Sequence, residues 1–246
     1  MDSEKIAKLQ EMINESNRIV FFGGAGVSTE SGVPDFRSVD GLYNQKYDYP
    51  PETMLSHSFY VTHREEFFRF YFDKLILDGI DPNKAHKKLA ELEEKGKLSA
   101  VVTQNIDGLH QAAGSKKVYE LHGSVLRNYC ENCGEFYDLA FVEEAKKKND
   151  LMLTCPKCKG RVKPDVVLYE EGLDNDTIRG AINAISSADM LIIGGTSLVV
   201  YPAAGLIDYF NGKYLVVINK QSTGRDASAD LVIEDAIGEV LDRIVV

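Results

Sequence analysis

The sequence has no long hydrophobic run and too few basic residues to balance its acidic ones. Its longest apolar stretches, RIVFFGGAGV (18–27) and MLIIGGTSLVV (190–200), are shorter than the ~20 apolar residues that cross a bilayer. The first residues, MDSEKIAKLQEM, are charged and contain no apolar core of a signal peptide. We therefore expect no membrane partner and a cytoplasmic location.

The shortage of positive charge also limits the classes of molecule that this protein is expected to bind. The chain has 28 Lys and Arg against 38 Asp and Glu, a formal net charge of −10. This disfavours specific nucleic-acid binding, which requires a basic face, and suits basic partners such as lysine-rich peptides. With 246 residues, 44% of them hydrophobic, the chain is long enough for one large domain or two modest ones. We expect a monomer.

Cysteines are few, and their spacing is specific. Cys130-x-x-Cys133 and Cys155-x-x-Cys158 are separated by 21 residues. Two such pairs predict a four-thiolate zinc site, and disulfides are disfavoured in a cytosolic chain. A thioredoxin-like redox motif does not fit, because neither pair follows a strand and opens a helix. Four thiolates leave no open coordination position, so the predicted zinc is structural.

Apolar strands alternate with amphipathic helices along the rest of the chain. This pattern predicts a parallel α/β sheet with helices on both faces, interrupted by a more charged insertion at 124–163. The predicted helices are 3–15, 54–77, 83–96, 174–188 and 236–243. The predicted strands are 18–24, 98–107, 117–121, 165–169, 189–197, 213–219 and 231–235.

Ligands of such sheets bind at the carboxyl ends of the strands, so the residues there are informative. GGAGVS (23–28) follows the first strand and offers bare backbone to a diphosphate, with Ser28 and a following helix N-terminus facing the anion. It is not a full G-x-G-x-x-G fingerprint, because Thr29 occupies the last position. A tight strand-to-helix packing turn is the alternative.

GVPDFRSVDGLY (32–43) is rich in turn residues and carries Phe36 beside Arg37. A loop of this composition is typical of a lid over a ligand. It fits a plain surface loop equally well.

TQNID (103–107) places polar side chains where a buried strand emerges. Leaving such groups buried without partners costs roughly 1–3 kcal/mol each, and a ligand rich in hydroxyls and amides, such as a nicotinamide riboside, would satisfy them. A helix N-cap by Asn105 or Asp107 is the alternative. A second glycine-hydroxyl turn, GGTSLVVYP (194–202), and Asn219 at another strand end favour a dinucleotide over a mononucleotide.

His122 ends the strand at 117–121 and is followed by a glycine that leaves room beside it. Histidine titrates near neutral pH and is the natural general base at pH 7. The remaining histidines lie in predicted helical stretches (57, 63, 86) or at a helix start (110), where a structural role is expected.

Together these motifs resemble the sirtuins, NAD-dependent protein deacylases, over about residues 5–240. The resemblance is carried by GAGVS (24–28), GVPDFR (32–37), TQNIDGLH (103–110), ELHGS (120–124), the two cysteine pairs, KPDVVLYEE (163–171), GTSLVVYP (195–202) and VIN (217–219). It implies a Rossmann-like NAD-binding domain (1–123 and 164–246) with a small inserted zinc-ribbon domain (124–163), which part of 32–80 would join. It also implies NAD in the cleft between them, and structural zinc.

The resemblance implies a role for each motif residue. His122 would be the catalytic base, assisted by Asn105. The implied NAD contacts are Gly24, Ala25, Gly26, Thr29, Phe36, Arg37, Gln104, Asn105, Ile106, Asp107, His122, Gly195, Thr196, Ser197, Asn219, Asp235 and Ala236. The implied contacts to an extended acyl-lysine peptide are Val167, Leu168, Tyr169, Leu198, Val199 and Val200. The implied zinc ligands are the four cysteines.

The implied reaction consumes NAD and an acyl-lysine and gives nicotinamide, O-acyl-ADP-ribose and free lysine. Mono-ADP-ribosyl transfer to protein is the alternative within the same family. The chain departs from the family at Tyr169-Glu170-Glu171, where Phe-Gly-Glu is usual. The added carboxylate suggests a preference for positive residues beside the target lysine.

Overall fold

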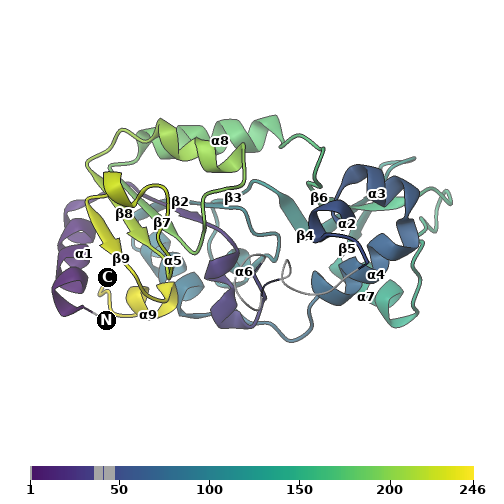
Figure 1. The fold of residues 1–246 in the computed structure, drawn as a ribbon, viewed down its shortest axis with the longest axis horizontal. Helices are drawn as coiled ribbons and strands as arrows, with labels where there is room; N and C mark the ends of the chain where they lie inside the picture. Colours follow the sequence, from purple (N-terminus) through teal and green to yellow (C-terminus); the bar gives the residue numbers. More distant parts are fainter. Residues whose placement is uncertain (1, 36–40, 42–47) are drawn as a thin grey trace.

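The computed structural model describes residues 2–35, 41 and 48–246. Its two sheets lie toward opposite ends of an elongated molecule (Figure 1). The larger sheet is entirely parallel, with the strand order β3-β2-β1-β7-β8-β9. We call this sheet with its covering helices the large-sheet region. Its strands are β1 (Ile19–Gly23), β2 (Leu98–Thr103), β3 (Val118–Glu120), β7 (Met190–Gly194), β8 (Tyr214–Ile218) and β9 (Leu231–Ile233).

Helices cover both faces of the large sheet, so its central strands are buried throughout. Phe21 of β1 packs into the layer of α1, α5 and α9, whereas its neighbour Phe22 packs into the layer of α8. This explains why these strands are apolar without alternation. Figure 1 shows α8 running along one face. The helices are α1 (Ser3–Glu15), α5 (Lys84–Glu94), α8 (Asn175–Ser187), a 3₁₀ helix (Ala203–Tyr209) and α9 (Ile237–Leu241).

The strand order determines where a ligand can bind. The chain builds outward from β1 to β3, then returns to place β7 against the free edge of β1. The connections after these two neighbouring strands therefore leave in opposite directions and open a crevice at their carboxyl ends. This is the topology of dinucleotide-binding sheets.

A smaller antiparallel sheet, ordered β5-β4-β6, forms the centre of what we call the small-sheet region. It has its own core, in which the fully buried aromatic rings of Phe67, Phe68 and Tyr71 pack with Cys155. Its elements are α2 (Pro51–Met54), α3 (His57–Thr62), α4 (Arg64–Lys74), β4 (Gly123–Cys130), β5 (Phe136–Asp138), α7 (Leu139–Lys147) and β6 (Val162–Val166). The short helix α6 (Leu109–Ala112) follows β2.

The structure corrects two predicted elements. The helix predicted over 54–77 is divided, because His63 leaves helical geometry at φ −128° and separates α3 from α4. The strand predicted at 165–169 was assigned to the parallel sheet, and this is wrong. The observed strand, β6, pairs antiparallel with β4, and its alternating burial is that of a sheet with one covered face.

The predicted boundaries at 124 and 163 stay a prediction. Residues from 54 to 76 share the core of the small-sheet region. None of the helices in the described ranges combines the length and the apolar character needed to span a bilayer.

Candidate active site

A cavity of about 970 Å³ opens at the carboxyl ends of the large sheet and extends to the small-sheet region. It brings together motifs that are far apart in the sequence. The predicted NAD contacts that line it are Gly24, Ala25, Gly26, Thr29, Gln104, Asn105, Ile106, Asp107, His122, Gly195, Thr196, Ser197, Asn219 and Asp235. Ala236 is not in the wall, although both of its neighbours are. Phe36 and Arg37 lie outside the described residues.

The two glycine turns meet at the base of this cavity. The Gly26 N–H donates to the Gly195 carbonyl at 2.8 Å, which joins the turn after β1 to the turn after β7. A Cβ at Gly26 would lie 2.8 Å from that same oxygen, so only glycine allows this approach. A three-residue 3₁₀ helix (Ala25–Val27) follows β1, in place of the predicted helix N-terminus facing an anion.

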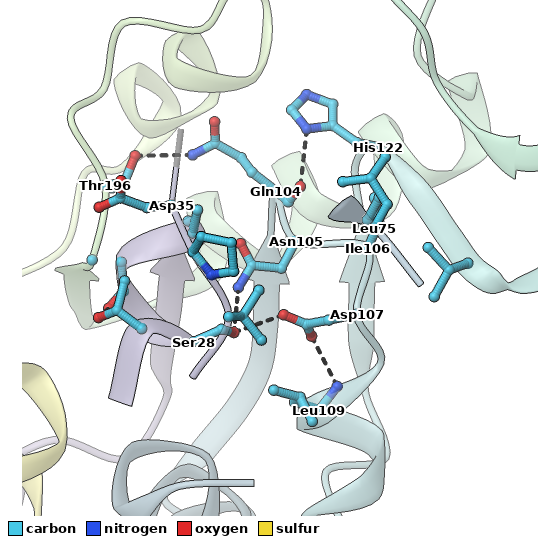
Figure 2. A pocket seen from close by; sticks show the side chains of 18 of the residues that line it. Ser28, Asp35, Leu75, Gln104, Asn105, Ile106, Asp107, Leu109, His122 and Thr196 are labelled. Carbon is cyan, nitrogen blue, oxygen red and sulfur yellow. Dashed lines mark hydrogen bonds between the residues drawn. The ribbon is translucent and has the colours of Figure 1, made fainter. Parts of the chain in front are cut away.

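Polar side chains link the strand ends across the crevice (Figure 2). The Gln104 Nε2 amide donates to Thr196 Oγ1 at 3.1 Å, joining the ends of β2 and β7. The backbone carbonyl of Gln104 accepts a hydrogen bond from His122 Nδ1 at 3.0 Å. One residue thus connects the glycine turn after β7 to the imidazole.

His122 is held as a neutral imidazole with one nitrogen available. Because a carbonyl can only accept, Nδ1 carries the proton and Nε2 keeps its lone pair. Burial lowers the pKa of His122, and the hydrogen bond to Gln104 opposes this only in part. Gly123, at φ +75°, is required beside it, because a Cβ there would lie 1.9 Å from the Asp165 carbonyl oxygen. The group has the protonation state of a general base at pH 7.

Ser28 is the centre of a second network. Its Oγ donates to Asp107 Oδ2 at 2.7 Å and accepts from Asn105 Nδ2 at 3.0 Å. We predicted that Ser28 would face an anion, but here it fixes two side chains of the TQNID segment. Asp107 Oδ1 also accepts from the Leu109 N–H at 2.9 Å, at the start of α6. The N-cap of α6 is Gly108, so the predicted N-cap at Asn105 or Asp107 is wrong, although Asp107 still satisfies the first N–H of the helix from one residue earlier.

Sequence reasoning missed the histidines behind this network. The Asn83 N–H donates to His86 Nδ1 at 3.3 Å, which leaves His86 Nε2 to face Ser28 Oγ at 3.5 Å. Burial lowers the pKa of His86 to about 4, against the opposing effect of Asp107. His110, whose ring centroid lies 4.7 Å from that of His86, has its pKa lowered to about 3 by burial and by His86. The signal in the sequence was Asn83 three residues before His86, a capping pair.

Only some of the predicted peptide contacts lie at the cavity. Val167, Leu168, Tyr169 and Val200 line the cavity, whereas Leu198 and Val199 do not. The Val167 N–H donates to the carbonyl of His122 at 2.9 Å, so this segment starts beside the imidazole.

The four cysteines converge as predicted. Their sulfur atoms all lie within 4.8 Å of one another, with 3.4 Å between Cys130 and Cys158 and 3.8 Å between Cys133 and Cys155. Tetrahedral zinc with Zn–S bonds of about 2.3 Å needs sulfur atoms roughly 3.8 Å apart. The donor set and its spacing therefore fit a structural zinc ion.

Comparison with known proteins identifies the family. The profile described as "Sir2 family" matches residues 24–202. The chain belongs to the Sir2 family. An NAD-dependent protein deacetylase of Clostridium perfringens is 64% identical to this family member over 98% of this chain and 99% of the relative. One of Clostridium acetobutylicum is 59% identical over 98% of both.

Solved structures of the Sir2 family have the same fold. A structure described as "Structural Basis for the Mechanism and Regulation of Sir2 Enzymes" matches with a TM-score of 0.90 and 42% identity over 99% of this chain and 97% of the other. Another, described as "Sir2-p53 peptide-NAD+", matches with a TM-score of 0.86 and 40% identity over 97% and 96%. The predicted family and the predicted α/β fold class, a Rossmann-like sheet with a smaller cysteine-bearing part, are confirmed.

Proposed function

We propose that this Sir2 family member is an NAD-dependent protein-lysine deacetylase. The observation that carries the proposal is the neutral imidazole of His122, whose Nδ1 is bonded to Gln104, at the wall of a cavity that two glycine turns close. Relatives at 64% and 59% identity over nearly the whole chain are named NAD-dependent protein deacetylases. One solved neighbour is described with both a p53 peptide and NAD+.

The residues of the large-sheet region suit NAD. The joined turns at Gly26 and Gly195 offer backbone without side chains, which a diphosphate requires. Asn105 and Asp107, held by Ser28, offer an amide and a carboxylate to a nicotinamide and its ribose. When bound, NAD supplies an electrophilic sugar carbon with nicotinamide as the leaving group. We propose that Asn219 and Asp235 serve the adenosine half.

We assign to His122 the movement of one proton. Its Nε2 accepts the proton of a sugar hydroxyl, and the Gln104 carbonyl stabilises the resulting charge through Nδ1–H. Because burial disfavours the charged ring, the base is regenerated readily at neutral pH. The four cysteines would hold a structural zinc ion, which would stabilise the fold of the small-sheet region. The segment from Val167 to Tyr169, which lines the cavity, would contact an acetyl-lysine peptide.

The test incubates an acetyl-lysine peptide with NAD and the wild-type protein or His122→Ala. We expect equal amounts of nicotinamide and deacetylated peptide from the wild type, and deacetylated peptide at background level from the variant. The rate should fall only as the pH drops below the ordinary histidine range, because the pKa of His122 is lowered. Wild-type protein that forms neither product would refute the proposal.

Mass spectrometry of the peptide separates the two family activities. Loss of the acetyl group supports deacetylation, whereas a gain of ADP-ribose would support transfer to protein. No feature of the described residues favours the second. The cytoplasmic location, the monomeric state and the absence of a specific nucleic-acid partner stay predictions.

A further inference from the structure

The turn that ends the predicted peptide-binding segment contains a residue in an unfavourable conformation. The Glu171 N–H donates to the Leu168 carbonyl at 3.0 Å and closes a four-residue turn. Glu170 is the third residue of that turn, with φ +76°. This is the pattern of a type II turn, whose third position favours glycine or asparagine because a Cβ is crowded in the left-handed region.

The side chain of Glu170 compensates for this conformation. Its Oε2 accepts from the backbone N–H of Ser58 and its Oε1 accepts from the Ser58 hydroxyl, both at 2.9 Å. Two hydrogen bonds to an ionised carboxylate are together of the same order as the strain of one such residue. The carboxylate that the sequence suggested as a contact for lysines thus has a partner within the chain.

The neighbouring residues attach the same turn to the same place. The Tyr169 N–H donates to the Leu55 carbonyl at 2.9 Å, and the Tyr169 carbonyl accepts from the His57 N–H at 3.0 Å. The carboxylate of Glu171 accepts from His57 Nδ1 at 2.8 Å, and also from the Leu168 N–H at 2.9 Å. Apart from the bond between Leu168 and Glu171, which lies within the turn, these bonds fix the turn to residues 55–57, at the start of α3.

The other predicted peptide-contact segment, residues 198–200, also contains a residue at positive φ, but that residue is held in a different way. Leu198 is also a non-glycine residue at positive φ, +56°, but its side chain packs partly buried against the core of the large-sheet region. One strained residue is held by apolar packing and the other, Glu170, by an exposed carboxylate. Backbone strain that the surroundings maintain is characteristic of ligand-binding segments.

We propose that Glu170 is a positioning residue for the substrate peptide. Through Ser58 it holds the turn at 168–171 in the left-handed form, so that Val167 to Tyr169 keep their place in the cavity wall, where the peptide would bind. The role concerns the shape of the binding segment and not the charge of the peptide. It rests on the proposed deacetylase function, since the peptide is the substrate of that reaction.

Four variants separate shape from charge. Glu170→Ala removes the carboxylate and keeps the Cβ, so we expect the KM for the peptide to rise about tenfold, equal to about 1.4 kcal/mol. Glu170→Gly also removes the carboxylate but tolerates positive φ, so its KM should stay within about threefold of wild type. Glu170→Gln keeps two polar atoms and should resemble the wild type. Ser58→Ala should raise the KM in the wild-type background and have no effect beside Glu170→Gly.

The KM for NAD should change in none of these variants, which a general loss of structure would not allow. Peptides with and without lysines beside the acetyl-lysine should give the same ratio of kcat/KM for the wild type and Glu170→Gln. Equal increases in the KM for the peptide in Glu170→Ala and Glu170→Gly would show that the carboxylate acts by its charge and would overturn the proposal. A change in the ratio of kcat/KM between the two peptides in Glu170→Gln would do the same.

Hydrogen exchange of the backbone amides at 167–171 gives a readout independent of activity. Exchange should be faster in Glu170→Ala than in the wild type or Glu170→Gly, and identical exchange in all three would contradict the role. Wild-type protein that deacetylates no peptide would refute the proposed function alone. Active wild type with unchanged KM in Glu170→Ala would refute this inference alone.

Discussion

The large-sheet and small-sheet regions are stabilised in different ways. In the first, six parallel strands are covered on both faces, and two apolar cores lie above and below them. In the second, a three-stranded sheet has one aromatic core, and the chain from Cys130 to Cys158 depends on four sulfur atoms that have no disulfide among them. The comparison indicates that the large-sheet region is stable by burial, whereas the small-sheet region adds a cysteine site that fits a structural metal.

The division has a functional consequence. The cavity takes its glycine turns from the large-sheet region, but it takes Val125 and Val166 to Tyr169 from the small-sheet region and the segment that follows it. Loss of the small-sheet region would therefore open one wall of the site and leave the other intact.

The largest effect is expected from loss of zinc. Cys155→Ser, or treatment with a strong chelator, should unfold the small-sheet region, because a structural zinc site contributes its binding energy directly to folding. Deacetylation should fall to background, while hydrogen exchange of β1 and β7 stays slow. Lys157→Ala, at an exposed position between Cys155 and Cys158, is the matched control and should keep zinc and activity. Cooperative loss of both sheets would contradict the division.

The parts of this arrangement that the sequence predicts are local. The cysteine pairs, the glycine turns and His122 at a strand end are each contained in a few residues, so their spacing could be interpreted directly. The sequence could not predict which sheet β6 joins, because DVVLY (165–169) is apolar enough for either one. Only the pairing of β6 with β4 determines its place. The contact between His86 and Ser28 joins residues 58 positions apart, and it exists only because α5 packs under the first glycine turn.

A smaller effect is expected from pH, through two buried histidines of the large-sheet region. His86 and His110 have pKa values lowered to about 4 and about 3, chiefly by burial. Their neutral forms are therefore favoured in the folded state, and the unfolded chain binds more protons below the ordinary pKa of 6.5. Their contribution to the free energy of unfolding is complete above pH 6.5 and is lost as the pH falls toward 4. At pH 4.5 the loss is about 2 to 3 kcal/mol for each imidazole.

Urea unfolding at pH 7 and pH 4.5 measures this loss. His110→Phe removes one titrating group and keeps the contact with Phe21, whose ring centroid lies 6.1 Å from that of His110. The variant should lose less stability than the wild type between the two pH values, and the difference between the proteins cancels any effect of acid on the zinc site. Equal losses would mean that His110 is protonated in the folded state.

The smallest effect is expected from a substitution where the two glycine turns meet. It should change the binding of NAD and not of the peptide, and so tests whether the two regions act separately. Gly26→Ala places a methyl group 2.8 Å from the Gly195 carbonyl oxygen, so the two turns must separate. Overpacking of this kind costs about 1–3 kcal/mol, and we expect the KM for NAD to rise about tenfold while the KM for the peptide is unchanged. Gly224→Ala is the matched control, because a Cβ there meets no atom within 4 Å. If Gly26→Ala raised the KM for the peptide as much as that for NAD, the two ends of the cavity would be mechanically coupled, and the separation of nucleotide and peptide functions between the two regions would have to be abandoned.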